Sequence, residues 1–314
     1  MTIRSLKYYV LLMVISLTNA CSVENAGVSH TVNVPKEAVL QHLYYLSSDA
    51  LKGRKIGTKG GKLAQNYIVS QLEQHSIAPL AESYFATFAI KKRFKYIRGK
   101  NVIGVIKGTQ FPNRFIVLSA HFDHIGSKGR QIYNGADDNA SGTSALLHYA
   151  KLIKQTPLRH SVIVLFTDGE EENLTGAKAF IRENTELLPD ILLNINLDML
   201  AGTRSTKKLH YISRGLKQVL TPDKIIALRQ QNYAIPLKKG FRRQSYGADK
   251  FIRWELASDH GAFYKQKIPF IYYGVGLHKH YHQTTDIYEN INQAFFLLAV
   301  ATIYQQISFI DQNL

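Results

Sequence analysis

The chain has 314 residues, of which 45% are hydrophobic and 20% are charged. This composition excludes an intrinsically disordered protein, and the length allows a large buried core in one or two α/β domains. The formal net charge of +16 indicates affinity for anionic partners. The basic residues are scattered, however, and no zinc-finger or RNA-binding signature is present, so we expect a solvated basic surface and no nucleic-acid partner.

The N-terminus has the pattern of a secretory signal peptide. Arg4 and Lys7 precede an apolar run at 8–17, and small and polar residues follow it. The apolar run is too short to span a membrane. We therefore predict a signal peptide at 1–20 and an exported protein.

The single cysteine, Cys21, directly follows this segment and resembles the lipidated cysteine of bacterial lipoproteins. Leu17 lies four residues before it, whereas the lipoprotein pattern prefers three. Cleavage after Ala20 without lipidation is the alternative. We expect a polar tether at 21–35, with the protein periplasmic or anchored in the membrane through Cys21, and a secreted soluble protein as the alternative.

From residue 36 onward, apolar residues recur at helical and strand spacing. Nearly continuous apolar strands alternate with helices, which indicates a mainly parallel sheet covered on both faces. We predict one α/β catalytic domain at 36–314 with a central mixed β-sheet. The last helix contains Thr302, Gln305 and Gln306 and is interpreted as core. The predicted helices lie at 36–46, 63–75, 139–155, 175–184, 222–233 and 293–310, and the strands at 85–90, 101–108, 114–121, 161–167, 191–198, 208–213 and 268–276.

Candidate metal ligands follow four of these strands. Imidazole and carboxylate donors suit a transition metal, with zinc as the first choice. In open α/β sheets, sites form outside the carboxyl ends of the strands, so ligands far apart in the sequence can converge. The candidates are His121, Asp138 on the loop after it, Glu170 and Glu171, Asp198, and His282.

This set suits a site with two metal ions. One carboxylate can bridge two zinc ions about 3.5–4 Å apart, and the water between them becomes the nucleophile. An acid beside a ligand can act as general base, and the adjacent pair Glu170 and Glu171 supplies one acid for each task. Asp123 lies two residues from His121 on the same strand face and can hold the other imidazole nitrogen.

Several motifs occur together in one order: LSSDALKGRKIGT, NVIGVIKG, SAHFDHIG, NGADDNASGTSALL, DGEEENLTGAKAF, NLDM, SDHGAF and YHQTTDIYENI. On these motifs, residues 36–295 resemble the two-zinc aminopeptidases and related exopeptidases, a family that includes glutamate carboxypeptidases, glutaminyl cyclases and transferrin-receptor ectodomains. The resemblance implies a three-layer zinc-exopeptidase sandwich of the phosphorylase/hydrolase-like type. The protease-associated insert of many bacterial relatives is absent, because only about 25 residues separate the second helix from NVIG.

The resemblance also implies roles for the ligands. His121 and Asp198 would hold one zinc ion and Glu171 and His282 the other, with Asp138 as the bridging carboxylate.

Further roles follow from the same resemblance. Glu170 would be the general base and Asp123 would orient His121. Asp137 would shape the loop, often through an unusual cis peptide bond in this family. We interpret His124 as an outer residue or as loop packing.

Three other histidines, His260, His278 and His280, are not expected to be ligands. Residues 203–256 are expected to form a flap or a substrate wall.

We therefore expect a zinc-dependent exopeptidase, and specifically an aminopeptidase that hydrolyses N-terminal residues from peptides. A glutaminyl cyclase, which works with one zinc ion, is the alternative. A non-catalytic binding ectodomain is disfavoured because all five ligands and the base are present. A separate hypothesis is that a basic loop favours an acidic side chain or a C-terminal carboxylate, through Arg242, Arg243, Lys250 and Arg253.

Overall fold

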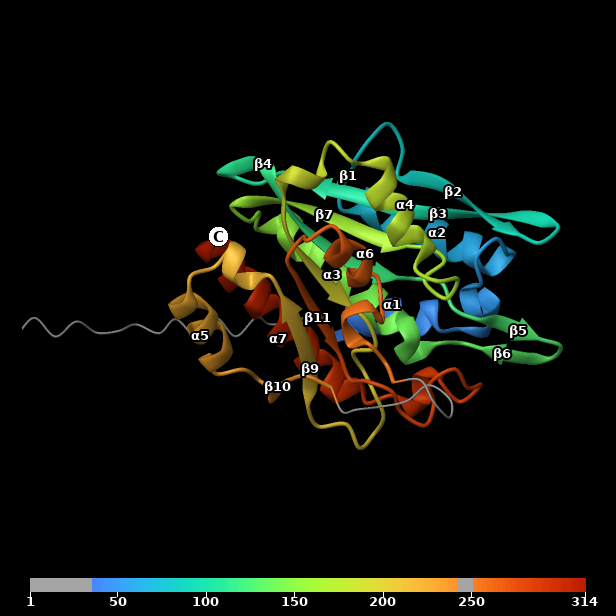
Figure 1. The fold of residues 1–314 in the computed structure, drawn as a ribbon. Helices are drawn as coiled ribbons and strands as arrows, with labels where there is room; N and C mark the ends of the chain where they lie inside the picture. Colours follow the sequence, from blue (N-terminus) through green and yellow to red (C-terminus); the bar gives the residue numbers. More distant parts are fainter. Residues whose placement is uncertain (1–35, 242–250) are drawn as a thin grey trace, which may run out of the picture. The chain divides into compact units, whose positions relative to one another are not determined.

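A mixed β-sheet forms the centre of the part of the chain that the structure, a computed structural model, describes: residues 36–241 and 251–314 (Figure 1). The predicted signal peptide and tether lie outside these residues. The described residues belong to one compact unit.

The sheet has the strand order β1-β3-β7-β4-β8-β11-β9-β10, and β2 pairs with β3. Its central strands β7, β4, β8 and β11 are mutually parallel, whereas β3 and β9 run antiparallel to their neighbours β7 and β11. The strands are β1 Ala78–Pro79, β2 Phe85–Lys92, β3 Lys95–Ile106, β4 Phe111–His121, β7 His160–Thr167, β8 Ile191–Leu197, β9 Leu209–Arg214, β10 Leu237–Lys239 and β11 Phe270–Gly274, with a separate hairpin of β5 Gly126–Lys128 and β6 Gln131–Tyr133.

Helices cover both faces of the sheet, because the central strands are apolar on both sides. Alternate residues of β4 point to opposite layers: Ile116 and Leu118 belong to the larger core cluster, and Val117 to the smaller one. The larger cluster includes α1 Lys36–Leu46, α2 Lys59–Gln74, α3 Gly142–Gln155, α5 Pro222–Gln230 and α7 Gln293–Asn313; the smaller includes α4 Thr175–Glu183 and α6 His260–Lys265. The predicted sandwich with a mostly parallel mixed sheet is confirmed.

Helix α7 is the one helix in the described ranges that is long and apolar enough to cross a membrane, and half of its apolar segment is buried in the fold. The hydroxyl of Tyr149 in α3 donates a hydrogen bond to the carbonyl oxygen of Val300 at 2.9 Å. The polar residues Thr302 and Gln306 of α7 are buried. Within this fold α7 is a core helix, as the sequence analysis interpreted it.

The region 203–256 is not a single flap. Strand β9 pairs with β11, and β10 pairs with β9, so both extend the sheet. Helix α5 packs against α7 and ends at Gln230, three residues earlier than predicted. Among the described residues of this region, Ile252 and Trp254 line a pocket next to the candidate site.

Candidate metal centre

The candidate ligands come from four adjacent parallel strands. His121 is the last residue of β4, Asp198 follows β8 directly, and Glu171 lies four residues beyond the end of β7. His282 lies on the loop after β11. Since parallel strands present their carboxyl ends at the same edge, residues 161 positions apart in the chain meet there.

One group of ligand atoms forms around the ring of His121. Its Nε2 lies 3.4 Å from Oδ1 of Asp198 and 3.4 Å from Oδ1 of Asp138. All three residues are buried. Burial alone would lower the pKa of His121, but Glu170 and Asp198 raise it well above the ordinary value. The negative charges around this ring therefore favour a cation beside it.

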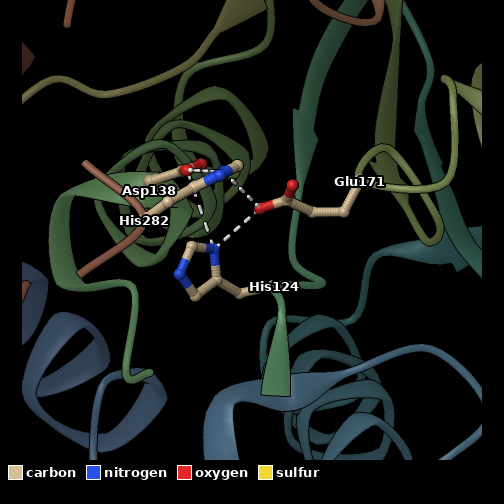
Figure 2. Close-up of side chains that lie close together, drawn as sticks. All are labelled: His124, Asp138, Glu171 and His282. Atoms are coloured by element: carbon tan, nitrogen blue, oxygen red, sulfur yellow. Dashed lines mark ion pairs between the residues drawn. The ribbon is translucent and has the colours of Figure 1, made fainter. Parts of the chain in front are cut away.

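A second group uses the other oxygen of Asp138. Nε2 of His282 lies 3.2 Å from Oδ2 of Asp138 and 3.2 Å from Oε1 of Glu171. Nδ1 of His124 lies 2.9 Å from the same Glu171 oxygen and 3.7 Å from Asp138 Oδ2. Figure 2 shows these four side chains pointing toward one another. The turn after β4 directs the ring of His124 into this group, so His124 is not merely loop packing; its interpretation as an outer residue stays a prediction.

The two oxygens of Asp138 thus face different groups, which is the geometry expected of a bridging carboxylate. Its position is fixed through the backbone. The carboxylate of Asp286 accepts hydrogen bonds from the amides of Asp137 at 2.9 Å and Asp138 at 3.0 Å. The peptide bond between Asp138 and Asn139 is cis. Asp286 has no role in the sequence analysis, although it lies within the motif YHQTTDIYENI.

Asp137 shapes the loop through its side chain. Its Oδ1 accepts hydrogen bonds from the amide of Ala201 at 2.7 Å and the hydroxyl of Ser141 at 3.2 Å, and its Oδ2 lies 2.8 Å from Nε2 of His278. The cis peptide bond of this loop follows Asp138, the residue after Asp137.

Asp123 connects His121 to Glu170. Nδ1 of His121 lies 3.1 Å from the backbone carbonyl oxygen of Asp123 and 3.7 Å from its carboxylate oxygen Oδ1. Donation from Nδ1 to that carbonyl leaves Nε2 free to face Asp138 and Asp198. Oδ1 of Asp123 also accepts a hydrogen bond from the amide of Glu170 at 3.0 Å.

The surplus of buried acids supports a metal ion at this edge. Burial raises the pKa of Glu170 well above its ordinary value, with Asp198, Glu171 and Asp259 adding to the rise. Burial likewise raises the pKa of Asp259 to about 7. Burial also acts to raise the pKa of Glu171, but His124 and His282 outweigh this effect and lower that pKa below its ordinary value. Buried carboxylates require compensation by a cation, and imidazole with carboxylate is a donor set that fits zinc.

A small pocket of about 190 Å³ opens beside the first group. One wall of the pocket is formed by His121, Asp138 and Asp198 of the first group together with Glu170, and the other walls are mainly apolar. The pocket is lined by His121, Asp138, Glu170, Asp198, Met199, Ile252, Trp254, Ala257, Tyr272, Leu277 and Tyr281.

The remaining histidines have other partners. Nε2 of His260 lies 2.8 Å from the carbonyl oxygen of Trp254, and Nδ1 of His280 lies 2.8 Å from the hydroxyl of Thr285. His278 is directed to Asp137, so among the described residues these three histidines lie outside both groups.

Arg54 is a buried cation that the sequence analysis did not single out. It donates hydrogen bonds to four backbone carbonyls, and none of these acceptors is a carboxylate. Burial lowers its pKa to about 10, so it stays charged at neutral pH. The acceptors belong to Leu46, Phe122, Asn134 and Gly135. Arg54 therefore ties together the two loops that carry His124 and Asp138. Its signal in the sequence is an arginine within the glycine-rich turn LKGRKIGT.

The basic loop of the specificity hypothesis lies mostly outside the described residues, which exclude Arg242, Arg243 and Lys250. Arg253 is described and does not line the pocket.

Curated relatives share part of the chain's length. The alkaline phosphatase isozyme conversion protein of Escherichia coli (strain K12) is 26% identical over 201 residues, covering 57% of this chain and 56% of that protein. A glutamate carboxypeptidase 2 homolog from Caenorhabditis briggsae is 30% identical over 191 residues, covering 56% of this chain and 24% of the relative. The chain thus matches about half or less of these relatives' length.

Solved structures share the fold. BSAP, a zinc aminopeptidase from Bacillus subtilis, aligns with a TM-score of 0.66 and 15% identity over 87% of this chain and 94% of its own. The Fimbriiglobus ruber glutaminyl cyclase aligns with a TM-score of 0.67 and 15% identity over 88% and 96%. A sequence model of peptidase family M28 matches residues 101–305, which contain every predicted ligand. The chain belongs to peptidase family M28.

Proposed function

We propose that this protein is a zinc-dependent aminopeptidase that holds two zinc ions and removes N-terminal residues from peptides. The observation that carries the proposal is the position of Asp138, whose two oxygens face two separate groups of ligand atoms beside an apolar pocket. The ligands are His121, Asp138, Glu171, Asp198 and His282, with Glu170 as the general base.

When bound, zinc would supply Lewis-acid chemistry: it would polarise the scissile carbonyl and lower the pKa of water to near neutral pH. The chain supplies the proton transfers. Glu170 lies on the pocket wall next to His121 and Asp198, where it can take a proton from the attacking water and deliver it to the leaving amine. Asp123 holds both the ring of His121 and the amide of Glu170, so the base and the ligand keep a fixed separation.

The pocket supports an apolar N-terminal side chain. Its walls include Met199, Trp254 and Leu277, and its acidic wall can pair with a free α-ammonium. Within the described residues, neither lysine nor arginine lines it.

The test uses the zinc-loaded protein and a panel of aminoacyl chromogenic substrates. We expect hydrolysis of leucyl and methionyl substrates, slower hydrolysis of glutamyl substrates, and none when the amine is acetylated. Cleavage of acetylated peptides from the C-terminus would contradict an aminopeptidase. Cyclisation of peptides with N-terminal glutamine, without hydrolysis, would establish the cyclase instead.

A matched pair of variants isolates the base. Glu170→Gln should lower kcat by about 10²–10⁴-fold while zinc stays bound. Glu172→Gln is the control, because Glu172 pairs with Lys92 at the surface and does not line the pocket. Equal activity of Glu170→Gln and Glu172→Gln would rule out Glu170 as the base.

We also propose that residues 1–20 direct export and that Cys21 carries a lipid anchor. The support is the charged start, the short apolar run and the cysteine that follows. Expressed with its N-terminus intact in a bacterium, the protein should fractionate with membranes and incorporate labelled fatty acid. Cys21→Ala should release it to the periplasm. Fatty-acid labelling that persists in Cys21→Ala would refute the anchor.

A further inference from the structure

The two ligand groups are unequal. The group around His121 contains three residues, and the group around His282 contains four, because His124 joins it. Zinc sites with three protein ligands keep a position open for water or substrate, whereas sites with four protein ligands are closed. The difference therefore depends on whether His124 binds the metal.

The geometry points to His124 as a further zinc ligand: we propose that its Nδ1 binds the ion held by Asp138, Glu171 and His282. This inference rests on the proposed zinc centre. Ligands at about 2.0–2.1 Å from a tetrahedral zinc lie about 3.3 Å from one another. The four separations between a histidine nitrogen and a carboxylate oxygen in this group are 2.9, 3.2, 3.2 and 3.7 Å. The atoms therefore surround a space of the size that one zinc ion requires.

The ring of His124 is held in this orientation by packing. It is buried, and a Cβ added at Gly135 would lie only 2.6 Å from its Cγ and Cδ2 atoms. Gly135 adopts a φ of 57°, which glycine accepts without strain. The ring of His282 approaches in an edge-on arrangement, with centroids 5.6 Å apart. The chain thus directs Nδ1 at the group without needing a hydrogen bond to orient it.

The unsatisfied polar atoms of His124 and Glu171 support the same role. Neither ring nitrogen has a hydrogen-bond partner in the described structure, and Oε1 of Glu171 has none either, although His124 Nδ1 lies 2.9 Å from that oxygen. Buried polar atoms are normally satisfied. A cation between Nδ1 and the carboxylate would satisfy both atoms.

The assignment separates the two ions by role. The pocket is lined by His121, Asp138 and Asp198 of the first group, but not by His124, Glu171 or His282. The ion beside His124 is therefore the tightly held one, and substrate is bound on the side of His121.

Zinc binding tests the proposal directly. The apo protein is titrated with zinc against a competing chromogenic chelator, and the two dissociation constants are compared among variants. His124→Ala and His124→Asn should each weaken the tighter site by about 100-fold or more, since loss of an outer-shell contact alone costs about 10–100-fold. The asparagine can still donate a hydrogen bond to Glu171, so it separates ligation from hydrogen bonding.

His148→Asn is the matched control. His148 is also buried, and its ring nitrogens also lack hydrogen-bond partners in the described structure, but it belongs to neither ligand group. It should keep both dissociation constants within threefold of the parent. A His124→Asn protein that keeps both constants within threefold would overturn the proposal.

A second measurement needs no variant. X-ray absorption of the parent protein with one equivalent of zinc should show two imidazole ligands, from His124 and His282. A single imidazole would overturn the proposal even if the variants fail to fold. If the parent binds no zinc at all, the proposed function fails as well; if it binds two ions with one imidazole each, only the role of His124 fails.

Discussion

The two ligand groups share Asp138 but differ in surroundings. The group around His121 lines the apolar pocket, next to Glu170, and contains one histidine. The group around His282 contains two histidines and has only the shared Asp138 on the pocket wall. Sites that bind substrate need an open position, and sites that hold a metal permanently do not. We therefore infer that the two groups, which share the carboxylate of Asp138, differ in role. The group around His121 binds substrate, and the group around His282 retains its metal ion.

The shared carboxylate gives the largest expected effect. Asp138→Ala removes a ligand from both groups. It should therefore lower the affinity for both zinc ions by more than about 100-fold and abolish peptidase activity. Zinc titration and aminoacyl-substrate assays measure this result. Retention of one ion at parental affinity would mean that Asp138 does not bridge.

Asp198→Asn should affect only the pocket side. Asp198 belongs to the His121 group alone, so activity should fall at least about 100-fold while one zinc ion remains at parental affinity. The measurement pairs metal content after dialysis with kcat/KM. Equal loss of both ions would show that the two groups are not separable.

Arg54→Met should destabilise the two loops that carry His124 and Asp138. The substitution leaves four buried carbonyls without their donor, including those of Asn134 and Gly135 beside the ligand loop. We expect the free energy of unfolding of the apo protein to fall by about 3–5 kcal/mol, as measured by urea denaturation. Arg54→Lys should recover only part, because an ammonium has three donors and no planar fork. A change below about 1 kcal/mol for Arg54→Met would contradict this role.

His148→Leu provides the smallest effect and isolates a buried histidine with no metal role. Burial lowers the pKa of His148 from 6.5 to about 4. Between these pH values the unfolded chain binds a proton that the folded chain does not, so the free energy of unfolding decreases as pH falls through the window. From pH 7 to pH 5 this costs about 2 kcal/mol, which His148→Leu should remove. Identical pH slopes for parent and variant, in urea unfolding of the apo proteins, would contradict it.

Part of the candidate site was predictable because two of its residues lie where apolar runs end. His121 and Asp198 directly end or follow buried strands, and the family motifs identify Glu171 and His282. The sheet rule then places them at one edge. The predictions of the family and of the fold are confirmed, the first by the family match and the second by the solved structures.

Other features could not be read from the local sequence. His124 has the same spacing whether its ring faces the loop or the ligands, and only the packing against Gly135 decides it. Asp286 and Arg54 act through backbone atoms that are 148 and 68 positions away, respectively. Backbone acceptors leave no sequence pattern, since every residue has a carbonyl.

The sequence by itself determined the α/β class, the order of the strands along the chain and the identity of the donor atoms, because hydrophobic periodicity and ligand chemistry are local properties. Only the tertiary structure decided the strand order in the sheet, the division of Asp138 between two groups and the inward direction of His124. Those features depend on contacts between segments distant in the sequence, where packing and the satisfaction of buried polar groups select one arrangement among those that the local pattern permits.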